Sequence, residues 1–230
     1  MQRSMESSGT SNRSAQAQLL IMAKYPEPGQ VKTRLASAIG PQAACTLYRA
    51  FILDLAARLG PIGFPITWAY TPAEAPFASL VPGSRCMPQE GRDLGERMAH
   101  ATATLLTADA LPVLVIGTDS PHLPVAALAE AAQALAGDAD VVLGPADDGG
   151  YWLVGLRAPA PGLFERVSWG DPSVFAETLD RAAAGGLRVH VAAGTFDVDE
   201  TDALEELRAL LRRGDVDLPH TARLLGISRG

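Results

Sequence analysis

A single aspartate that comes shortly after an apolar run is the residue best placed for chemistry in this sequence. Asp119 follows residues 111–116 (LPVLVI), a run typical of a buried parallel strand. Open α/β sheets bind ligands at the carboxyl ends of their strands. Asp119 is therefore a candidate catalytic and metal-holding residue, because Mg²⁺ is commonly bound by carboxylates together with substrate phosphates. The alternative is a helix N-cap, since Asp119 and Ser120 precede Pro121.

A second acidic group stands before the last predicted helix. Asp197 and Asp199 alternate, so an extended backbone places both side chains on one face. Together with Asp119 they form a candidate site for a divalent cation that binds the phosphates of a nucleotide. The alternative is an acidic helix N-terminus, which the helix dipole favours. That alternative explains Glu200 and Asp202 better than it explains Asp197.

The loop after the first predicted strand carries three cations. Lys24, Lys32 and Arg34 lie in residues 24–34 (KYPEPGQVKTR), and backbone N–H groups around Gly29 are suited to cradling an anion. Lys binds phosphate as a point charge and Arg as a bidentate fork. The loop matches neither the Walker A pattern nor G-x-G-x-x-G. The alternative is an ordinary solvated surface loop.

Residues 89–97 (QEGRDLGER) open another helix and add Gln89 and Arg97 to the candidate phosphate-binding residues. The helix dipole disfavours a cation in the first turn, so Arg97 there points to an anionic partner. The alternative is that Asp93 caps the helix and Arg97 faces solvent.

Paired aspartates and paired glycines connect two later strands. Asp147 or Asp148 is a candidate for orienting an acceptor, with Asp148 the candidate catalytic base. Gly149 and Gly150 would let a sugar or flat ligand approach the backbone next to Tyr151. The alternative is a tight turn, which the same residue types favour.

Strands and helices alternate along the chain. We predict strands at 18–23, 65–70, 111–116, 140–144, 151–156 and 187–191, and helices at 41–59, 93–107, 124–136, 172–184 and 201–213. This alternation predicts an α/β fold with a mostly parallel, doubly wound sheet and helices on both faces. We expect residues 71–92 to be irregular, 1–16 to be a disordered leader, 17–213 to be one domain, and 214–230 to be a tail with a helical turn at 221–225.

The composition limits the function further. The chain has 230 residues, 47% of them hydrophobic, and a net charge of −7. We therefore expect no nucleic-acid partner, and any phosphate site must be a local basic patch. No apolar run is long enough for a membrane span, so we expect no membrane insertion. Cys45 and Cys86 indicate reduced packing residues of a cytoplasmic protein. Ala-rich helix faces fit a homo-oligomer interface or the core alike.

Five motifs, in this order, resemble a known family. They are AKYPEPGQVKTRL at 23–35, QEGRDLGERM at 89–98, GTDSP at 117–121, GPADDGGYWLVGL at 144–156 and DVDETDAL at 197–204. Together they resemble the DUF2064 family, glycosyltransferase-like proteins of the GT-A (nucleotide-diphospho-sugar transferase) fold, over residues 18–213. The family is also similar to guanylyltransferases that activate phospholactate or molybdopterin.

The resemblance implies roles for the matching residues. Lys24, Lys32 and Arg34 would hold nucleotide phosphates, and Asp119 and Asp199 would hold Mg²⁺ or Mn²⁺. The last motif departs from the family pattern, because Thr201 stands where proline is usual. This departure weakens the fixed turn and leaves the carboxylates in place.

Three functional hypotheses follow from these residues. The first is a metal-dependent glycosyltransferase that moves a sugar from a nucleotide sugar to a small-molecule acceptor. The second is a nucleotidyltransferase that joins a nucleoside monophosphate, taken from a triphosphate, to a phosphorylated small molecule and releases pyrophosphate. Three cations in one loop suit a triphosphate somewhat better than a diphosphate. The third is a nucleotide-binding module without turnover.

Overall fold

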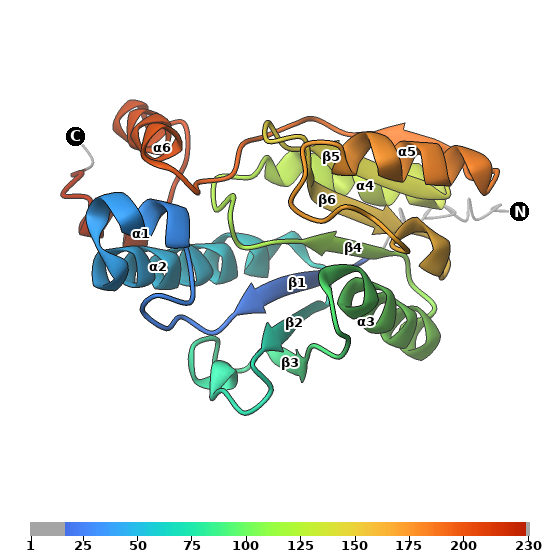
Figure 1. Cartoon of the computed structure of the whole chain (residues 1–230), viewed down its shortest axis with the longest axis horizontal. Helices are drawn as coiled ribbons and strands as arrows, with labels where there is room; N and C mark the ends of the chain where they lie inside the picture. The colour runs from blue at the N-terminus through green and yellow to red at the C-terminus, as the bar shows by residue number, and fades with distance from the viewer. Residues whose placement is uncertain (1–16, 229–230) are drawn as a thin grey trace, which may run out of the picture.

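Seven strands form one sheet in the computed structural model, which describes residues 17–228 (Figure 1). The expected leader at 1–16 lies outside the described residues. The strands are β1 (Gln18–Lys24), β2 (Ile66–Thr71), β3 (Arg85–Pro88), β4 (Val113–Ile116), β5 (Val141–Pro145), β6 (Tyr151–Leu156) and β7 (Val189–Val191). Their order across the sheet is β3-β2-β1-β4-β6-β5-β7, and β6 runs antiparallel to both of its neighbours. The other pairings are parallel, as predicted.

Helices cover both faces of the sheet, which confirms the predicted fold class. They are α1 (Thr33–Ile39), α2 (Pro41–Leu59), α3 (Leu94–Asp109), α4 (Val125–Ala136), α5 (Val174–Ala184), α6 (Thr201–Arg213) and α7 (Pro219–Leu224). Helices α2 and α4 pack on one face, and α3 and α5 pack on the other. A third cluster joins α1, α2 and α6 at one end of the molecule (Figure 1).

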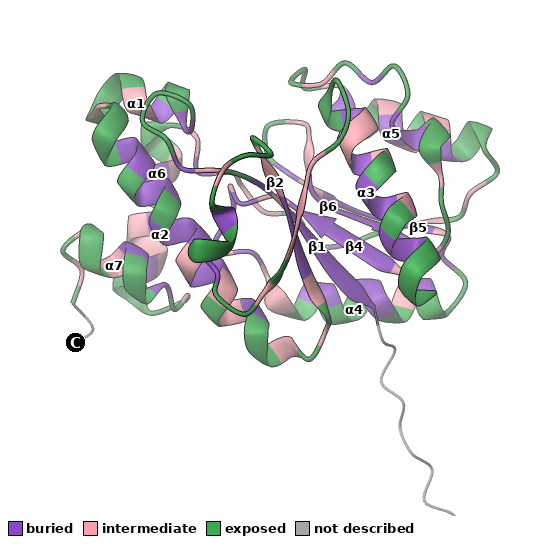
Figure 2. Cartoon of the chain, turned by 90° about the horizontal axis from the view of Figure 1, so that it is seen from below, coloured by how far each residue is buried: buried purple, intermediate pink, exposed green. Residues whose placement is uncertain are grey.

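The central strands are buried on both sides, which explains their continuous apolar sequences. On β1, Leu19 and Ile21 pack toward α2 and α4, whereas Leu20 packs toward α3. Each of these three side chains has no exposed surface. The strands at the middle of the sheet are accordingly the most uniformly buried elements of the fold (Figure 2).

Two short elements were absent from the sequence prediction. Helix α1 begins at Thr33, so the loop predicted at residues 24–34, here called the basic loop, ends at Lys32, and Arg34 lies on α1. Only Leu35 of this helix is buried. Strand β3 lies at 85–88, within the segment expected to be irregular, and pairs with β2 at the edge of the sheet. Both elements are too short to show a periodic apolar pattern.

One edge of the sheet collects the segments with the predicted site residues. The parallel strands β1, β2, β3, β4, β5 and β7 all end at this edge, and antiparallel β6 begins there. The basic loop, the segment after β4, the β5–β6 connection and the segment before α6 therefore converge. This is the edge at which open α/β sheets bind ligands.

The C-terminal segment packs back on α2 through a buried carboxylate. The side chain of Asp54, which has no exposed surface, accepts hydrogen bonds from the backbone N–H groups of His220 and Thr221, both at 2.9 Å. It also accepts one from the Thr221 hydroxyl at 2.6 Å. Asp54 thus satisfies the free amides at the start of α7, which has no cap from its own side chains.

We expect Asp54→Ala to lower the free energy of unfolding by about 2–4 kcal/mol, because it leaves buried donors of α7 unsatisfied. Urea denaturation measures this loss, and hydrogen exchange should show that the α7 amides lose protection first. Asp180→Ala, on an exposed position of α5, is the matched control. An equal loss in both variants would contradict the capping role.

Candidate functional site

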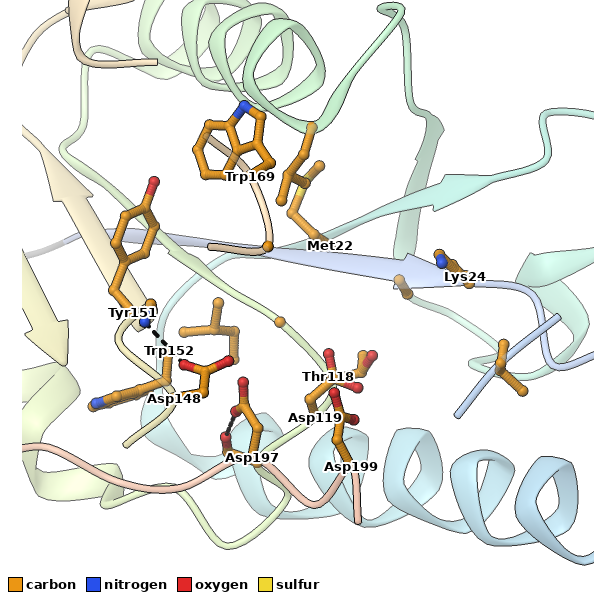
Figure 3. Close-up of a pocket in the computed structure, with 18 of the residues that line it drawn as sticks. Met22, Lys24, Thr118, Asp119, Asp148, Tyr151, Trp152, Trp169, Asp197 and Asp199 are labelled. Carbon is orange, nitrogen blue, oxygen red and sulfur yellow. Dashed lines mark hydrogen bonds between the residues drawn. The ribbon is translucent and has the colours of Figure 1, made fainter. Parts of the chain in front are cut away.

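A cavity of about 640 Å³ opens at this edge of the sheet (Figure 3). Its walls come from the ends of β1 and β4, the basic loop, the start of α3, the β5–β6 connection, the segment before α5 and the segment before α6. Most of the predicted site residues line it: Lys24, Lys32, Arg34, Gln89, Arg97, Asp119, Asp148, Gly150, Tyr151, Asp197 and Asp199. Residues far apart in the sequence are thus brought into one pocket.

A buried lysine lies between two of the predicted metal ligands. The ammonium of Lys32 forms ion pairs with Asp119 and with Asp199, the latter at 2.6 Å. It also lies 5.7 Å from the centre of the Phe51 ring. Burial alone would lower the pKa of Lys32, but the charges of Asp119 and Asp199 outweigh it and raise this pKa to about 12. Lys32 therefore stays charged and neutralises part of the acidic cluster formed by Asp119, Asp197 and Asp199.

An unusual backbone conformation at Lys32 directs its side chain toward Asp119 and Asp199. Lys32 has φ 48°, a left-handed conformation, and is the residue directly before α1. Such a conformation is uncommon for a residue with a side chain. The chain thus turns sharply at the end of the basic loop and carries the lysine inward.

Asp197 has a different environment from that of Asp119 and Asp199. Its carboxylate accepts a hydrogen bond from the Ser120 hydroxyl. Burial raises the pKa of Asp197 to about 6, and the negative charges of Asp119 and Asp148 add to the rise. Asp197 therefore takes up a proton at a higher pH than an ordinary aspartate does.

A buried tyrosine fixes the ends of β1 and β4 relative to each other. The Tyr48 hydroxyl accepts a hydrogen bond from the Lys24 backbone N–H at 3.0 Å and lies 2.8 Å from the Thr118 hydroxyl. Burial raises the pKa of Tyr48 to about 12, with a contribution from the charge of Asp119. The Val198 N–H donates to the Asp119 carbonyl at 2.9 Å, which also fixes the acidic segments to each other.

The other predicted cations are less constrained. Lys24 is exposed at the end of β1, and Arg34 is exposed with a loose ion pair of 3.8 Å to Glu200. Arg97 lies in the first turn of α3, and its Nε donates to the Gly91 carbonyl at 3.0 Å. Lys24 and Arg34 thus remain accessible to a ligand in the cavity.

Gln89 has a structural task at the same edge. Its side-chain N–H groups donate to the carbonyls of Ala23 at 3.1 Å and Ala69 at 2.8 Å. These bonds connect the ends of β1 and β2. The amide nitrogen is therefore engaged, although the side chain lines the cavity.

The β5–β6 connection is a turn that also presents a carboxylate to the cavity. The Asp148 carboxylate accepts a hydrogen bond from the Gly150 N–H at 2.9 Å, and Tyr151 begins β6. The segment is therefore a turn, and Asp148 and Gly150 also line the cavity, where their role in a site stays a prediction.

Three predicted residues do not line the cavity: Gly29, Asp147 and Gly149. Gly29 is exposed, and Asp147 is exposed with its N–H bonded to the Thr195 carbonyl at 3.2 Å. Gly149 has φ +88°, and a Cβ there would lie 2.1 Å from the Pro172 carbonyl oxygen. This glycine thus permits close packing of two chain segments, not the approach of a substrate.

Sequence reasoning missed three residues that shape the site: Tyr48, Ser120 and Trp169. Tyr48 lies within the predicted helix at 41–59, where the pattern of residues gives no signal for its hydroxyl. Ser120 belongs to the GTDSP motif but was interpreted as part of a helix cap. Trp169 lies in a segment without periodicity, so no pattern indicated that it lines the cavity.

The donor set suits a cation that is shared with a substrate. No group of three or more His, Cys, Asp or Glu converges on a metal position within residues 17–228. Asp119 and Asp199 each contact Lys32 through Oδ1, and their side chains remain 44% and 37% exposed. Two partly exposed carboxylates fit Mg²⁺, which commonly completes its coordination with waters and substrate phosphates.

The fold and the site together define a nucleotide-diphospho-sugar transferase-like α/β protein, and the comparisons identify the family. Residues 61–171 match the family "Uncharacterized protein conserved in bacteria (DUF2064)". A crystal structure from Desulfovibrio desulfuricans G20, described as a "putative nucleotide-diphospho-sugar transferase", is 32% identical, with a TM-score of 0.85 over 91% of this chain and 94% of that chain. The chain therefore belongs to the DUF2064 family, which confirms the resemblance seen in its motifs.

More distant structures share the fold alone. 4-Diphosphocytidyl-2C-methyl-D-erythritol synthase from Anaerococcus prevotii DSM 20548 is 12% identical, with a TM-score of 0.52 over 86% of this chain and 99% of that chain. No curated protein matches the sequence. Among the described residues, none of the helices has the length and apolar character needed to cross a membrane.

We expect Lys32→Met to lower the free energy of unfolding by about 1–3 kcal/mol, because it leaves Asp119 and Asp199 close together without their shared cation. The partial exposure of both carboxylates keeps the loss below that of a fully buried pair. Arg34→Met is the matched control, since its ion pair is exposed. Chemical denaturation in low salt checks both, and equal small losses would contradict the pairing.

We expect His122 to make the free energy of unfolding depend on pH. Its ring centre lies 4.0 Å from that of Phe196, and burial, with a contribution from the charge of Arg58, lowers its pKa to about 4. The unfolded chain takes up this proton near the ordinary value of 6.5, so the free energy of unfolding falls as the pH drops from 6.5 to about 4. The loss is up to about 3 kcal/mol.

His122→Gln should remove this part of the pH dependence. Denaturation of both proteins at about pH 7 and about pH 4 measures it. Asp197 titrates in the same window with the opposite sign, but it is present in both proteins and cancels in the difference. Parallel pH profiles would contradict the role of His122.

Proposed function

We propose that this protein is a metal-dependent transferase that takes a sugar from a nucleotide-sugar donor to a small-molecule acceptor. The observation that carries the proposal is the pair of ion pairs that Lys32 forms with Asp119 and Asp199 in the cavity. The printed description of the relative from Desulfovibrio desulfuricans supports the same class of donor.

The charge balance favours a diphosphate over a triphosphate. Of the three cations predicted to bind phosphate, Lys32 is neutralised, which leaves Lys24 and Arg34 exposed for phosphate. Two cations match the two negative charges of a sugar-linked diphosphate more closely than the larger charge of a triphosphate. The engagement of Lys32 thus reverses the preference that the number of cations in the loop suggested.

Different residues of the chain would have different roles in the reaction. Lys24 and Arg34 would bind the diphosphate, and Asp119 and Asp199 would hold Mg²⁺ or Mn²⁺ against it. The cation would stabilise the negative charge that develops on the leaving diphosphate. Asp148 lies on the other side of the acidic cluster and would accept the proton of the acceptor hydroxyl (Figure 3).

Nucleotidyl transfer is the second candidate, since Arg97 adds a cation at the opening of α3. The two reactions break different bonds. Glycosyl transfer breaks the bond between the sugar carbon and the phosphate oxygen and releases a nucleoside diphosphate. Nucleotidyl transfer breaks the α–β phosphate linkage and releases pyrophosphate.

The proposal is tested by thermal stability against ADP, CDP, GDP, UDP, their triphosphates and their common sugar conjugates, with and without Mg²⁺. We expect one diphosphate and one of its sugar conjugates to stabilise the protein only with the metal. The gain is about 2.7 kcal/mol at 100 times the dissociation constant. Asp119→Asn and Asp199→Asn should each reduce the metal-dependent gain strongly, because each removes a charged ligand.

Asp138→Asn, on an exposed position after α4, is the matched control and should keep the full gain. Stabilisation by a triphosphate alone, with release of pyrophosphate on turnover, would move the assignment to nucleotidyl transfer. Absence of stabilisation across the panel, or an unchanged gain in both aspartate variants, would contradict the proposal.

A further inference from the structure

The cavity has a second end, away from the residues proposed to bind phosphate and metal. Met22, Tyr151 and Trp169 gather there, while Lys24 lies at the opposite side, away from Tyr151 and Trp169 (Figure 3). Leu94, the first residue of α3, also lines the cavity, although 43% of its surface is exposed. Apolar side chains that remain exposed in a cavity are available for contact with a ligand.

Trp169 is fixed in place by its neighbours. Its ring lies edge-on to that of Tyr151, with centres 6.3 Å apart and an angle of 82° between the planes. A Cβ at Gly95 would lie 2.9 Å from Trp169 Nε1, so the indole packs directly on the start of α3. The indole is only partly buried and lines the cavity. A rigid, partly exposed aromatic ring is a good stacking surface, because little entropy is lost when a ligand covers it.

Two carboxylates belong to the segments that form this aromatic end. Asp148 lies beside Tyr151 (Figure 3). Asp171 comes two residues after Trp169 and also lines the cavity. Asp148 accepts from the Gly150 N–H and Asp171 from the Ser173 N–H, and within residues 17–228 neither is in an ion pair. Arg97, on α3, is a cation that also lines the cavity, and its Nε donates a hydrogen bond to the Gly91 carbonyl.

The geometry points to an acceptor subsite formed by Tyr151, Trp169, Met22 and Leu94. It takes a small neutral or cationic molecule with a flat apolar ring face, and it excludes phosphorylated acceptors. The ring stacks on Trp169, while a phosphate at this end would be repelled by Asp148 and Asp171. The acceptor role of this subsite rests on the proposed glycosyl transfer, and the subsite defines the chemical class of the second substrate.

Three probes with the same ring and different charge test this subsite: benzyl alcohol, benzylamine and benzyl phosphate. The protein is labelled with 5-fluorotryptophan, and the ¹⁹F resonance of Trp169, assigned with Trp169→Phe, reports on binding. Trp68 is the internal control, since it is 1% exposed and does not line the cavity. We expect the alcohol and the amine to shift the Trp169 resonance at millimolar concentration, and the phosphate to bind there roughly tenfold more weakly.

Charge variants separate stacking from electrostatics. Asp148→Asn combined with Asp171→Asn should raise the affinity of benzyl phosphate at Trp169 roughly tenfold and change benzyl alcohol little, because only the repulsion is removed. Tighter binding of the phosphate than of the alcohol in the wild type would overturn the inference and assign Arg97 as an anion-binding residue.

The outcome is distinguishable from that of the proposed function, which rests on nucleotide binding at the Lys24 end. If a nucleoside diphosphate stabilises the protein and none of the probes shifts Trp169, the subsite is refuted and the proposed function stands. If the neutral and cationic probes bind at Trp169 and no nucleotide binds, the ring-binding subsite stands and its role as an acceptor site is refuted.

Discussion

The ion pairs of Lys32 with Asp119 and Asp199 are the interaction on which the rest of the site depends. A buried ammonium is tolerated only when opposite charges compensate its loss of hydration. Here the three partners come from the basic loop, the segment after β4 and the segment before α6. The same contacts therefore join three distant parts of the chain and keep two carboxylates close together despite their mutual repulsion.

This arrangement also divides the cavity into regions with different chemistry. Lys24 and Arg34 are exposed where they line the cavity, and the carboxylates paired with Lys32 keep part of their surface free. At the second end, Trp169 and Tyr151 provide an aromatic surface beside Asp148. A substrate with a charged half and an apolar half, or two substrates that meet in the middle, fits this division.

The sequence was sufficient to predict the fold and the edge of the sheet at which the cavity lies. Long apolar strands and amphipathic helices carry strong periodic signals, and the carboxyl ends of parallel strands must meet. The pairing of Lys32 could not be predicted, because it depends on a left-handed backbone at that residue and on a helix of seven residues that follows it. The roles of Gly149 and Trp169 depend on contacts between segments far apart in the sequence, which no local pattern records.

The most direct test of the central claim is calorimetric titration of Mn²⁺ into the protein, alone and with a saturating nucleoside diphosphate. Because Lys32 already neutralises Asp119 and Asp199, we predict weak binding of the metal alone and at least roughly tenfold tighter binding with the nucleotide. Lys32→Met should bind the metal alone more tightly than the wild type. Tight metal binding that is independent of nucleotide and unchanged in Lys32→Met would contradict the account.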